Sequence, residues 1–489
     1  MPQGTNNSLG RQIPQVDTTT YGQGDLRDAP KKTRKKRSKR QGDGPSHENA
    51  RSLITRRGLL FGALGAGAVA AGVVGAQAIA QRSESSTEEI VTLEVSEEDV
   101  WDLESCSEVD AADAFELIGD FDLPFGSLVW VDDDEVAACL FPTEQASPLA
   151  TVAAMSLSTG NYFDVLEAAV GADEGFEIYD VRGNSSGFAW MEADIMEGRW
   201  RLYAAPLSEF TLGEPHLIEE GGSEQEVPTI TVQGSYVFWQ SMAPVTNENA
   251  RSEPSFVKRA HLSTGDAQTV YESKGRMSAP ITTFGDGIIF TPRHDDAPSY
   301  CDLVRINAES GKIEERITLP SGMMPNQVGY GPTGFSFCFE SIYDYGGGIA
   351  NLGTYTPSTD PRGGSYEGLE WFRFNRTPTA APCWCTDSWF MVKSNQSVCG
   401  VNFANRIFCS LGLESGCLDW GDYLVSSGMR DTVVTCMQID QIDNDNVETK
   451  KTQVRVWRPA AAIEESTETQ ADATVLADNA EAAEEAGAA

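Results

Sequence analysis

The chain has 489 residues, 40% of them apolar, and ten tryptophans, which is enough material for a sizeable hydrophobic core. Its net charge of −37 is unevenly distributed: residues 1–57 hold 13 Lys/Arg against 5 Asp/Glu, and the remainder holds 23 against 68. So acidic a body repels phosphate backbones, which argues against nucleic-acid binding, and the reversal of charge is typical of a protein that straddles a membrane.

Residues 1–55 lack periodic apolar residues and are rich in Gly, Gln, Asn, Thr and Pro, which predicts a disordered basic head on the cytoplasmic side. Within this head, Lys31–Arg40 (KKTRKKRSKR) has two interpretations: a nucleic-acid or nuclear-targeting patch, and a positive flank beside a membrane. We favour the membrane flank, because an uncharged segment begins fewer than twenty residues later.

Gly58–Gln81 contains no charged residue and is long enough to cross about 30 Å of hydrocarbon as a helix. It follows Arg56 and Arg57 and begins GLLF, a pattern that resembles the twin-arginine export signal, whose apolar cores are also weak and rich in Gly and Ala. The resemblance implies that residues 56–81 are handled by the twin-arginine translocase. We expect a retained transmembrane anchor; cleavage at small-residue sites such as Ala76–Ala78 would instead give a secreted protein.

Beyond the anchor we expect a linker, residues 82–124, with a short strand at Val91–Val95 and a short helix near Val109–Leu117. Residues 125–459 show no long helical pattern. Their β-branched and aromatic runs, broken by Gly, Pro, Asn and Asp about every eight to twelve residues, predict an all-β fold. Residues 460–489 hold eight acidic and no basic residues, and we expect a disordered acidic tail.

A repeated unit organises residues 125–459. Four segments each consist of a proline, a short strand, a Gly- or Asp-containing turn and a second strand: Pro228–Gln240, Pro280–Thr291, Pro325–Cys338 and Pro382–Lys393. Weaker copies, Gly126–Val131 and Gly187–Glu192, align Trp130 and Trp190 with Trp239. A second hairpin follows, as in His261–Val270, so that units of four strands begin near residues 125, 177, 228, 280, 325, 382 and 418.

Four antiparallel strands repeated about every 45–50 residues are the pattern of propeller blades, because a radial arrangement covers both apolar faces of each sheet. The body resembles bacterial β-propellers of the TolB-like, WD-repeat and quinoprotein-like kind. We therefore predict a seven-bladed β-propeller, with six or eight blades as alternatives. The alternative fold is two β-sandwich domains. That fold does not explain the recurrent order of proline, strand, turn and strand.

All ten cysteines follow the uncharged segment, and six of them gather in the last two predicted blades: Cys383, Cys385, Cys399, Cys409, Cys417 and Cys436. An even number on the exported side predicts disulfides among these six. Free buried thiols are the alternative. A metal site is the third, although this cluster lacks histidine and its Cys-Trp-Cys spacing is not that of a zinc knuckle.

Other motifs are better explained by structure than by chemistry. Gly183–Gly187 (GNSSG) matches the elbow of serine hydrolases, but between two β-runs we predict a hairpin turn. His216, His261 and His294 fall in different predicted blades, and we expect each to be structural. The aromatic cluster Trp371–Phe374, Trp384, Trp389 and Phe390 is predicted to be core between blades rather than a ligand platform.

Acidic loops recur at Asp132–Glu135, Asp295–Asp296 and Asp443–Asp445. Paired carboxylates can hold calcium or cleave glycosides, but on so acidic a surface we expect charged hairpin tips. The sequence therefore identifies no cofactor, with calcium as a minor alternative. It identifies no catalytic residue either.

From these features we expect a binding or scaffolding module of the cell envelope, tethered to the membrane with its body outside. Its ligand would be held by loops at one face of the ring. The rival hypothesis is an extracytoplasmic glycosidase, lyase or quinone-cofactor oxidoreductase that uses carboxylates around the central channel. Three or more carboxylates at one mouth of the channel would favour the enzyme, and a plugged channel would favour the binder.

Overall fold

The computed structural model of the chain describes residues 90–245, 252–339, 349, 353–374, 381–442 and 448–461. The predicted basic head, the export signal with Arg56 and Arg57, and almost all of the acidic tail lie outside these residues. None of the helices in the described part is long and apolar enough to cross a membrane.

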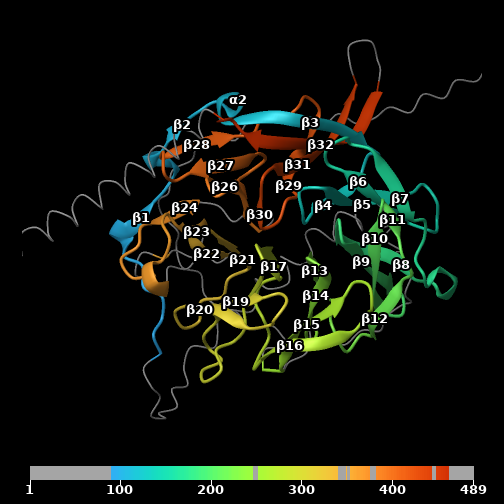
Figure 1. The fold of residues 1–489 in the computed structure, drawn as a ribbon, viewed down its shortest axis with the longest axis horizontal. Coiled ribbons are helices and arrows are strands. Elements are labelled where there is room, and N and C mark those ends of the chain that lie inside the picture. Colours follow the sequence, from blue (N-terminus) through green and yellow to red (C-terminus); the bar gives the residue numbers. More distant parts are fainter. Residues whose placement is uncertain are drawn as a thin grey trace, which may run out of the picture. The chain divides into compact units, whose positions relative to one another are not determined.

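The described strands form seven sheets arranged as a β-propeller, as predicted (Figure 1). We number the sheets as blades 1 to 7 in the order of their innermost strands. Blade 1 contains β4 (Leu128–Val131), β5 (Val136–Pro142), β6 (Ala150–Ser156) and β7 (Tyr162–Leu166). Blade 2 contains β8 (Glu177–Asn184), β9 (Gly187–Asp194), β10 (Arg199–Ser208), β11 (Thr211–Leu212) and β12 (His216–Gly221). Blade 3 contains β13 (Ile230–Gln233), β14 (Tyr236–Ser241), β15 (Ser255–His261) and β16 (Ala267–Ser273).

Blades 4 to 6 follow the same antiparallel order. Blade 4 contains β17 (Thr282–Phe284), β18 (Gly287–Phe290), β19 (Asp302–Asn307) and β20 (Ile313–Thr318). Blade 5 contains β21 (Gln327–Gly331), β22 (Gly334–Phe339), β23 (Gly353–Pro357) and β24 (Trp371–Phe374). Blade 6 contains β25 (Cys383–Cys385), β26 (Trp389–Lys393), β27 (Val398–Asn402) and β28 (Ile407–Ser410). The innermost strands begin within a few residues of the predicted starts of the units.

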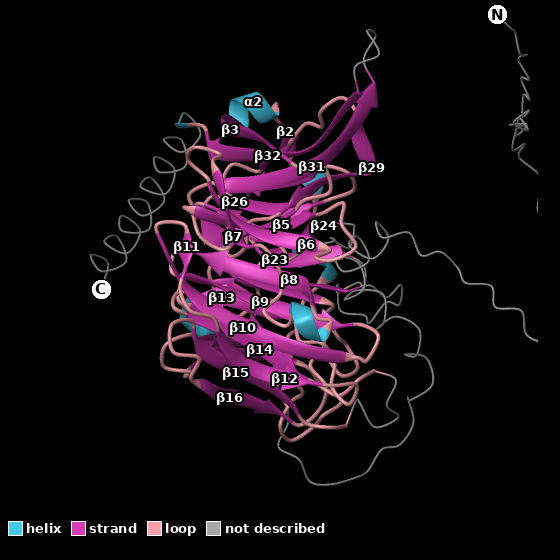
Figure 2. Ribbon diagram, turned by 90° about the vertical axis from the view of Figure 1, so that its right-hand side faces the viewer, coloured by secondary structure: helices cyan, strands magenta, loops and turns pink. Residues whose placement is uncertain are grey.

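Blade 7 combines a strand that precedes blade 1 in the sequence with three strands that follow blade 6. Its strands are β29 (Cys417–Leu424), β31 (Val433–Ile442), β32 (Glu448–Pro459) and, outermost, β3 (Phe115–Leu123). β3 runs antiparallel to β32, from Phe115 opposite Pro459 to Leu123 opposite Thr452, and Figure 2 shows the two strands side by side next to the helix α2 (Ala111–Ala114). The last sheet thus draws on residues that the sequence assigned to the linker.

The residues before β3 run along the outer edges of three further blades. The Leu93 backbone N–H donates to Thr318 O of blade 4 over 2.8 Å. β1 (Val100–Trp101) then pairs parallel to β24 of blade 5, and β2 (Ser107–Glu108) pairs parallel to β28 of blade 6. We call residues 90–123 the N-terminal strap, because they cover the unpaired backbone groups that an edge strand otherwise exposes.

Two predictions for this region need correction. Val91–Val95 is not a strand; it is irregular chain whose Leu93 and Val95 are buried against Leu303 and Leu319 of blade 4. The predicted helix is limited to α2, and the chain from Phe115 onward is extended because it pairs with β32. Short 3-10 turns complete the described elements: η1 (Glu97–Asp99), η2 (Leu103–Ser105), η3 (Ala172–Glu174) and η4 (Arg362–Gly364).

The alignment of the first repeat was also wrong. Trp190 and Trp239 lie on the second strands of their blades, β9 and β14, but Trp130 lies on β4, the first strand of blade 1. The second strand there is β5, which has no tryptophan to align. Gly126–Val131 is therefore the innermost strand of its blade and the turn before it.

Apolar side chains between neighbouring blades form the core. All eight residues of β9 are buried, because the neighbouring blades cover both faces of its sheet, whereas three of the five residues of the outer strand β7 are exposed. Blades 1 and 7 join through Val129 and Ala153 on one side and Val434 and Val454 on the other. Buried Trp371, Phe372, Trp384 and Trp389 confirm that the aromatic cluster is core.

We expect Phe115→Ala to destabilise the protein by about 3–5 kcal/mol, because it removes a large side chain from the strand that completes blade 7. Phe115 is 2% exposed and its ring centroid lies 4.9 Å from that of Trp389. Urea denaturation measures the loss. Leu117→Ala, on the same strand at a position 43% exposed, is the control and should cost less than about 1 kcal/mol; equal losses for both variants would contradict the role given to β3.

Candidate functional site

The two ends of the ring are built differently. In each blade the first and second strands are joined at what we call the hairpin end. The connections from second to third strand, and from one blade to the next, lie at the opposite end, which we call the loop end. Because propeller blades repeat the same strand order, connections of one kind gather at one end of the ring.

Hydrogen bonds join neighbouring connections around much of the hairpin end. They run from Ser185 N to Asp133 Oδ2 (2.5 Å), from Asn184 Nδ2 to Gly234 O (3.0 Å), from Gln233 Nε2 to Gly285 O (2.5 Å), from Thr386 N to Arg430 O (2.7 Å) and from Asp431 N to Asp134 Oδ1 (3.1 Å). These bonds link blades 1 to 4 in succession and blades 6, 7 and 1. The polar groups of this end are therefore used to hold the ring together.

The connection from β29 to β31 crosses the central channel at this end. Val131 N of blade 1 donates to Val425 O (2.9 Å), and Trp384 N of blade 6 donates to Gly428 O (2.8 Å). The Ser427 hydroxyl lies 3.4 Å from the Thr283 hydroxyl of blade 4. Residues 425–430, which include β30 (Met429–Arg430), thus contact the innermost strands of three separated blades, and Figure 1 places β30 near the centre.

Three consecutive aspartates also lie at the hairpin end, and each is held by the protein. Asp132 Oδ1 accepts from the Ser427 hydroxyl (2.7 Å), and its backbone oxygen accepts from Arg430. Asp133 accepts from three backbone N–H groups, and Asp134 from the backbone of residues 431 and 432. The acidic loop is the hairpin tip between β4 and β5, as predicted, and Asp132 in addition bonds to the crossing segment.

The loop end holds an open cavity of about 520 Å³ at blade 2, lined by Phe176, Arg199, Trp200, Arg201, Glu220, Gly221 and Gly222. The guanidinium groups of Arg199 and Arg201 lie 4.9 and 4.3 Å from the centre of the Phe176 ring. Gly221 leaves room for the indole, because a Cβ at this position would collide with the Trp200 ring. We call this the blade-2 cavity.

Carboxylates hold both arginines of the blade-2 cavity in place. Arg201 donates to both oxygens of Glu174, over 3.0 and 2.8 Å, and its Nε lies 3.4 Å from Glu220 Oε2. Arg199 pairs with Asp194 over 2.7 Å. Two donors nevertheless stay without an acceptor in the described part of the chain, Trp200 Nε1 and Arg201 Nε.

A second polar group at the loop end surrounds Asp302, a fully buried residue at the start of β19. His294 Nδ1 lies 3.0 Å from Asp302 Oδ1, and the Thr318 hydroxyl donates to the same oxygen over 2.8 Å. Because an ionised carboxylate only accepts hydrogen bonds, His294 carries its proton on Nδ1 and its Nε2 is an acceptor when the ring is neutral.

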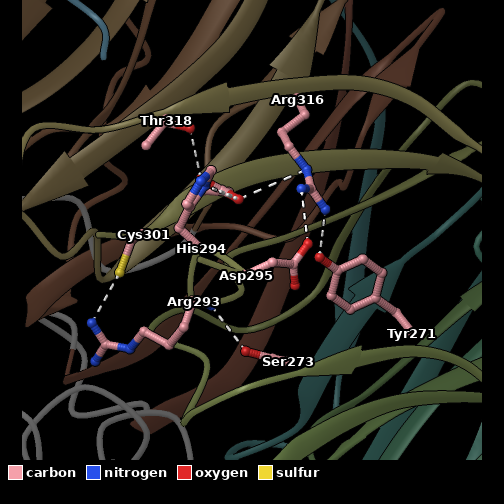
Figure 3. A network of polar contacts seen from close by, with 9 residues as sticks. Tyr271, Ser273, Arg293, His294, Asp295, Cys301, Arg316 and Thr318 are labelled. Atoms are coloured by element: carbon pink, nitrogen blue, oxygen red, sulfur yellow. Dashed lines mark hydrogen bonds and ion pairs between the residues drawn. The ribbon is translucent and has the colours of Figure 1, made fainter. Parts of the chain in front are cut away.

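Arg316 connects this group to blade 3. Its guanidinium donates to Asp295 Oδ2 (3.2 Å) and to the Tyr271 hydroxyl (2.7 Å), and its Nε lies 3.7 Å from Asp302 Oδ2; Figure 3 shows it facing both Asp295 and Tyr271. Burial raises the pKa of the Tyr271 phenol to about 12 although Arg316 opposes the shift, so Tyr271 stays protonated at neutral pH. We call these six residues, Tyr271, His294, Asp295, Asp302, Arg316 and Thr318, the blade-4 network.

The blade-4 network can orient a base, but its neighbours do not supply a nucleophile. Among the described residues, His294 makes no hydrogen bond to a hydroxyl or a thiol. The nearby Cys301 thiol accepts from Arg293 over 3.3 Å, yet burial raises its pKa more than Arg293 lowers it. A protonated thiol is a poor nucleophile, so we assign Cys301 no reaction.

The other predicted site residues are dispersed. His216 lies on β12 and His261 on β15, in blades 2 and 3, and Gly183–Gly187 forms the predicted hairpin turn between β8 and β9. Asp443–Asp445 lies outside the described residues. No group of three or more His, Cys, Asp or Glu side chains that could hold a metal ion occurs in the part of the chain that the structure describes.

All ten cysteines are free thiols in the structure. Among the six disulfide candidates, Cys383 and Cys385 lie on β25, Cys399 on β27, Cys409 on β28, Cys417 on β29 and Cys436 on β31. Cys399 is opposite Ser410 and Cys409 is opposite Gly400, so the two cysteines point to opposite faces of their sheet. A disulfide among these six stays a prediction, and this register disfavours the pair Cys399–Cys409.

Sequence reasoning missed the blade-2 cavity. Two segments could have pointed to it: the alternation Arg199-Trp200-Arg201 on β10, and the two consecutive glycines at the end of β12. Neither segment is unusual by itself. The cavity forms because η3, which precedes blade 2, packs beside the ends of β10 and β12.

No family model matches the chain, and no curated protein matches it. Solved structures are similar in fold. An oligogalacturonate lyase from Vibrio parahaemolyticus is 10% identical, with 71% of this chain and 100% of that chain covered and a TM-score of 0.35. Prolyl oligopeptidase B from Galerina marginata is 10% identical, with 70% of this chain and 51% of that chain covered and a TM-score of 0.43. The chain therefore spans about half of that protein.

Another solved oligogalacturonate lyase, described in complex with manganese, is 11% identical, with 70% of this chain and 98% of that chain covered and a TM-score of 0.35. Similarity at this level indicates neither ligand nor reaction. What the chain binds has to be inferred from its own residues.

We expect Asp132→Asn to stabilise the protein by about 1 kcal/mol at pH 7.5. Burial raises the pKa of Asp132, and its Oδ2 has no hydrogen-bond partner among the described residues. A carboxyl whose pKa is raised on folding contributes stability that is complete below its unfolded pKa of about 3.9 and is lost as the pH rises through the folded pKa.

The gain from Asp132→Asn should therefore disappear near pH 4, as measured by urea denaturation at the two pH values. Asp133→Asn is the matched control and should destabilise at pH 7.5, because the Asp133 carboxylate accepts three backbone hydrogen bonds. A loss of stability in Asp132→Asn at pH 7.5 would contradict this account.

We expect Asp302→Asn to destabilise the protein by about 2–4 kcal/mol, because an amide turns a donor toward groups that themselves donate, His294 Nδ1–H or Arg316. The free energy of unfolding in urea measures the loss. Asp296→Asn, at an exposed position of the same loop, should change stability by less than about 0.5 kcal/mol. Similar values for both variants would show that the blade-4 network contributes little.

Proposed function

We propose that this protein is a binding module of the cell envelope: a β-propeller exported through the twin-arginine route and tethered outside the membrane by residues 56–81. The single observation that supports binding is the difference between the two ends of the ring. At the hairpin end, polar groups join neighbouring connections and the segment 425–430, whereas the loop end keeps an open cavity at blade 2.

Binding sites are commonly concave and carry a few placed polar groups, and loops on a rigid scaffold commonly supply them. The blade-2 cavity meets this description. Its two arginines are paired with carboxylates before any ligand arrives, which lowers the entropic cost of binding.

The rival enzyme would use carboxylates at the channel. At the hairpin end each of the three consecutive aspartates accepts hydrogen bonds from backbone N–H groups or from Ser427, although Asp132 Oδ2 has no partner among the described residues, and the segment 425–430 crosses the channel beside them. At the loop end His294 has no hydroxyl or thiol partner among the described residues. These contacts favour a binder over a glycosidase, lyase or quinone-cofactor oxidoreductase.

The location is supported by the sequence alone. The cationic residues 1–57, the uncharged Gly58–Gln81 and the acidic remainder follow each other as expected for a chain whose N-terminus stays inside. The paired arginines before the uncharged segment indicate the route. A cleaved signal would preserve the export and remove the tether.

Proteinase K added to intact cells should digest the body of the wild-type protein. Arg56→Lys combined with Arg57→Lys should leave it protected, since twin-arginine export depends on the pair. Lys31→Ala combined with Lys32→Ala, in the same basic head, is the control and should be digested like the wild type. A wild-type body that stays protected while a known external protein is digested would refute export, and release into the medium would refute the tether alone.

A further inference from the structure

Two of the residues that line the blade-2 cavity, Trp200 and Arg201, carry unpaired buried donors, and these indicate what the cavity binds. Trp200 is 1% exposed, and its indole N–H has no acceptor among the described residues. A buried N–H without a partner is unfavourable, because it has lost its hydrogen bond to water. The two other tryptophans nearby are satisfied: Trp190 donates to Glu192 over 3.0 Å and Trp239 donates to Glu219 over 2.8 Å.

Charge around the cavity argues against an anion as the ligand. Two guanidinium groups, of Arg199 and Arg201, are surrounded by three carboxylates, of Glu174, Asp194 and Glu220. The local sum is negative, and the part of the chain after residue 57 carries a large excess of Asp and Glu. A carboxylate or phosphate ligand would lose its water without gaining a net attraction.

A donor and an acceptor lie side by side on two residues that line the cavity. Arg201 Nε, a donor without a hydrogen-bond partner, lies 3.4 Å from Glu220 Oε2, an acceptor whose side chain is 63% exposed. A hydroxyl group can accept from the first and donate to the second at once, because it carries one hydrogen and two lone pairs. Neighbouring hydroxyls on one ring would match this arrangement.

We propose that the blade-2 cavity binds a neutral saccharide. One sugar hydroxyl accepts from the Trp200 indole N–H, and another bridges Arg201 Nε–H and the Glu220 carboxylate. The cavity of about 520 Å³ lies within the usual size of small-molecule sites. The inference deepens the proposed binding function and rests on it, but it does not depend on export or on the tether.

The test uses the full chain, purified in a detergent without a sugar headgroup. The probes are glucose, galactose, mannose, N-acetylglucosamine and their β-linked disaccharides, with glucuronate and galacturonate as charged counterparts. Saturation-transfer NMR and tryptophan fluorescence report binding. At least one neutral sugar should bind in the millimolar range or tighter, and its uronate should bind at least about tenfold more weakly.

Two variants locate the site. Trp200→Phe removes the unpaired N–H, and Glu220→Gln removes the exposed charge; each should weaken the neutral sugar about tenfold. Glu220→Gln should also narrow the difference between the sugar and its uronate. Trp239→Phe is the matched control: it breaks the bond to Glu219, so it should lower Tm while the sugar affinity stays as in the wild type.

Three results would overturn the proposal: no neutral sugar binds the wild type, a uronate binds more tightly than its neutral counterpart, or Trp200→Phe binds sugar as the wild type does. If Trp200→Phe fails to fold, Glu220→Gln decides, since its side chain is exposed. Sugar binding by a protein that proteinase K cannot reach in cells would refute the location and leave this proposal intact.

Discussion

The pairing of β3 with β32 is the constraint on which the rest of the structure depends. A ring of sheets has a seam wherever its first and last blades meet, and here one sheet contains strands from both ends of the propeller. The part of the N-terminal strap that precedes β3 adds backbone pairing at the edges of blades 5 and 6 and one bond at blade 4. Contacts between blades 1 and 7 then complete the core. The N-terminal strap and the contacts between blades 1 and 7 together hold the small sheets in place around the ring.

Rigidity of the ring explains why its two ends differ. At the hairpin end, short connections meet near the axis, so their polar groups find partners in one another and in the crossing segment 425–430. The loop end also carries hydrogen bonds between blades, as from Leu149 N to Glu177 Oε2 and from Arg316 to the Tyr271 hydroxyl. At blade 2, however, the connection that contains η3 packs beside the ends of β10 and β12, and the open cavity lies among these segments.

Local patterns predicted much of the fold. The recurrence of proline, strand, turn and strand is a property of each blade, so it placed the innermost strands near Ile230, Thr282 and Gln327. Trp130 misled the alignment because the first blade has its tryptophan on a different strand. β3 was missed because its partner lies more than 300 residues away and nothing in FELIGDFDL identifies it. The blade-2 cavity was missed for the same reason, since its wall combines a connection from one blade with strand ends of the next.

A sheet assembled from both ends of the propeller also ties completion of the fold to completion of the polypeptide. While the ribosome is still adding residues before Glu448, β3 has emerged without the strand it must pair with. Blades 1 to 6 can form as they are synthesised, but the ring stays open until β32 is released. Quality control that recognises an unpaired strand would therefore distinguish a truncated product from a finished one by this single seam.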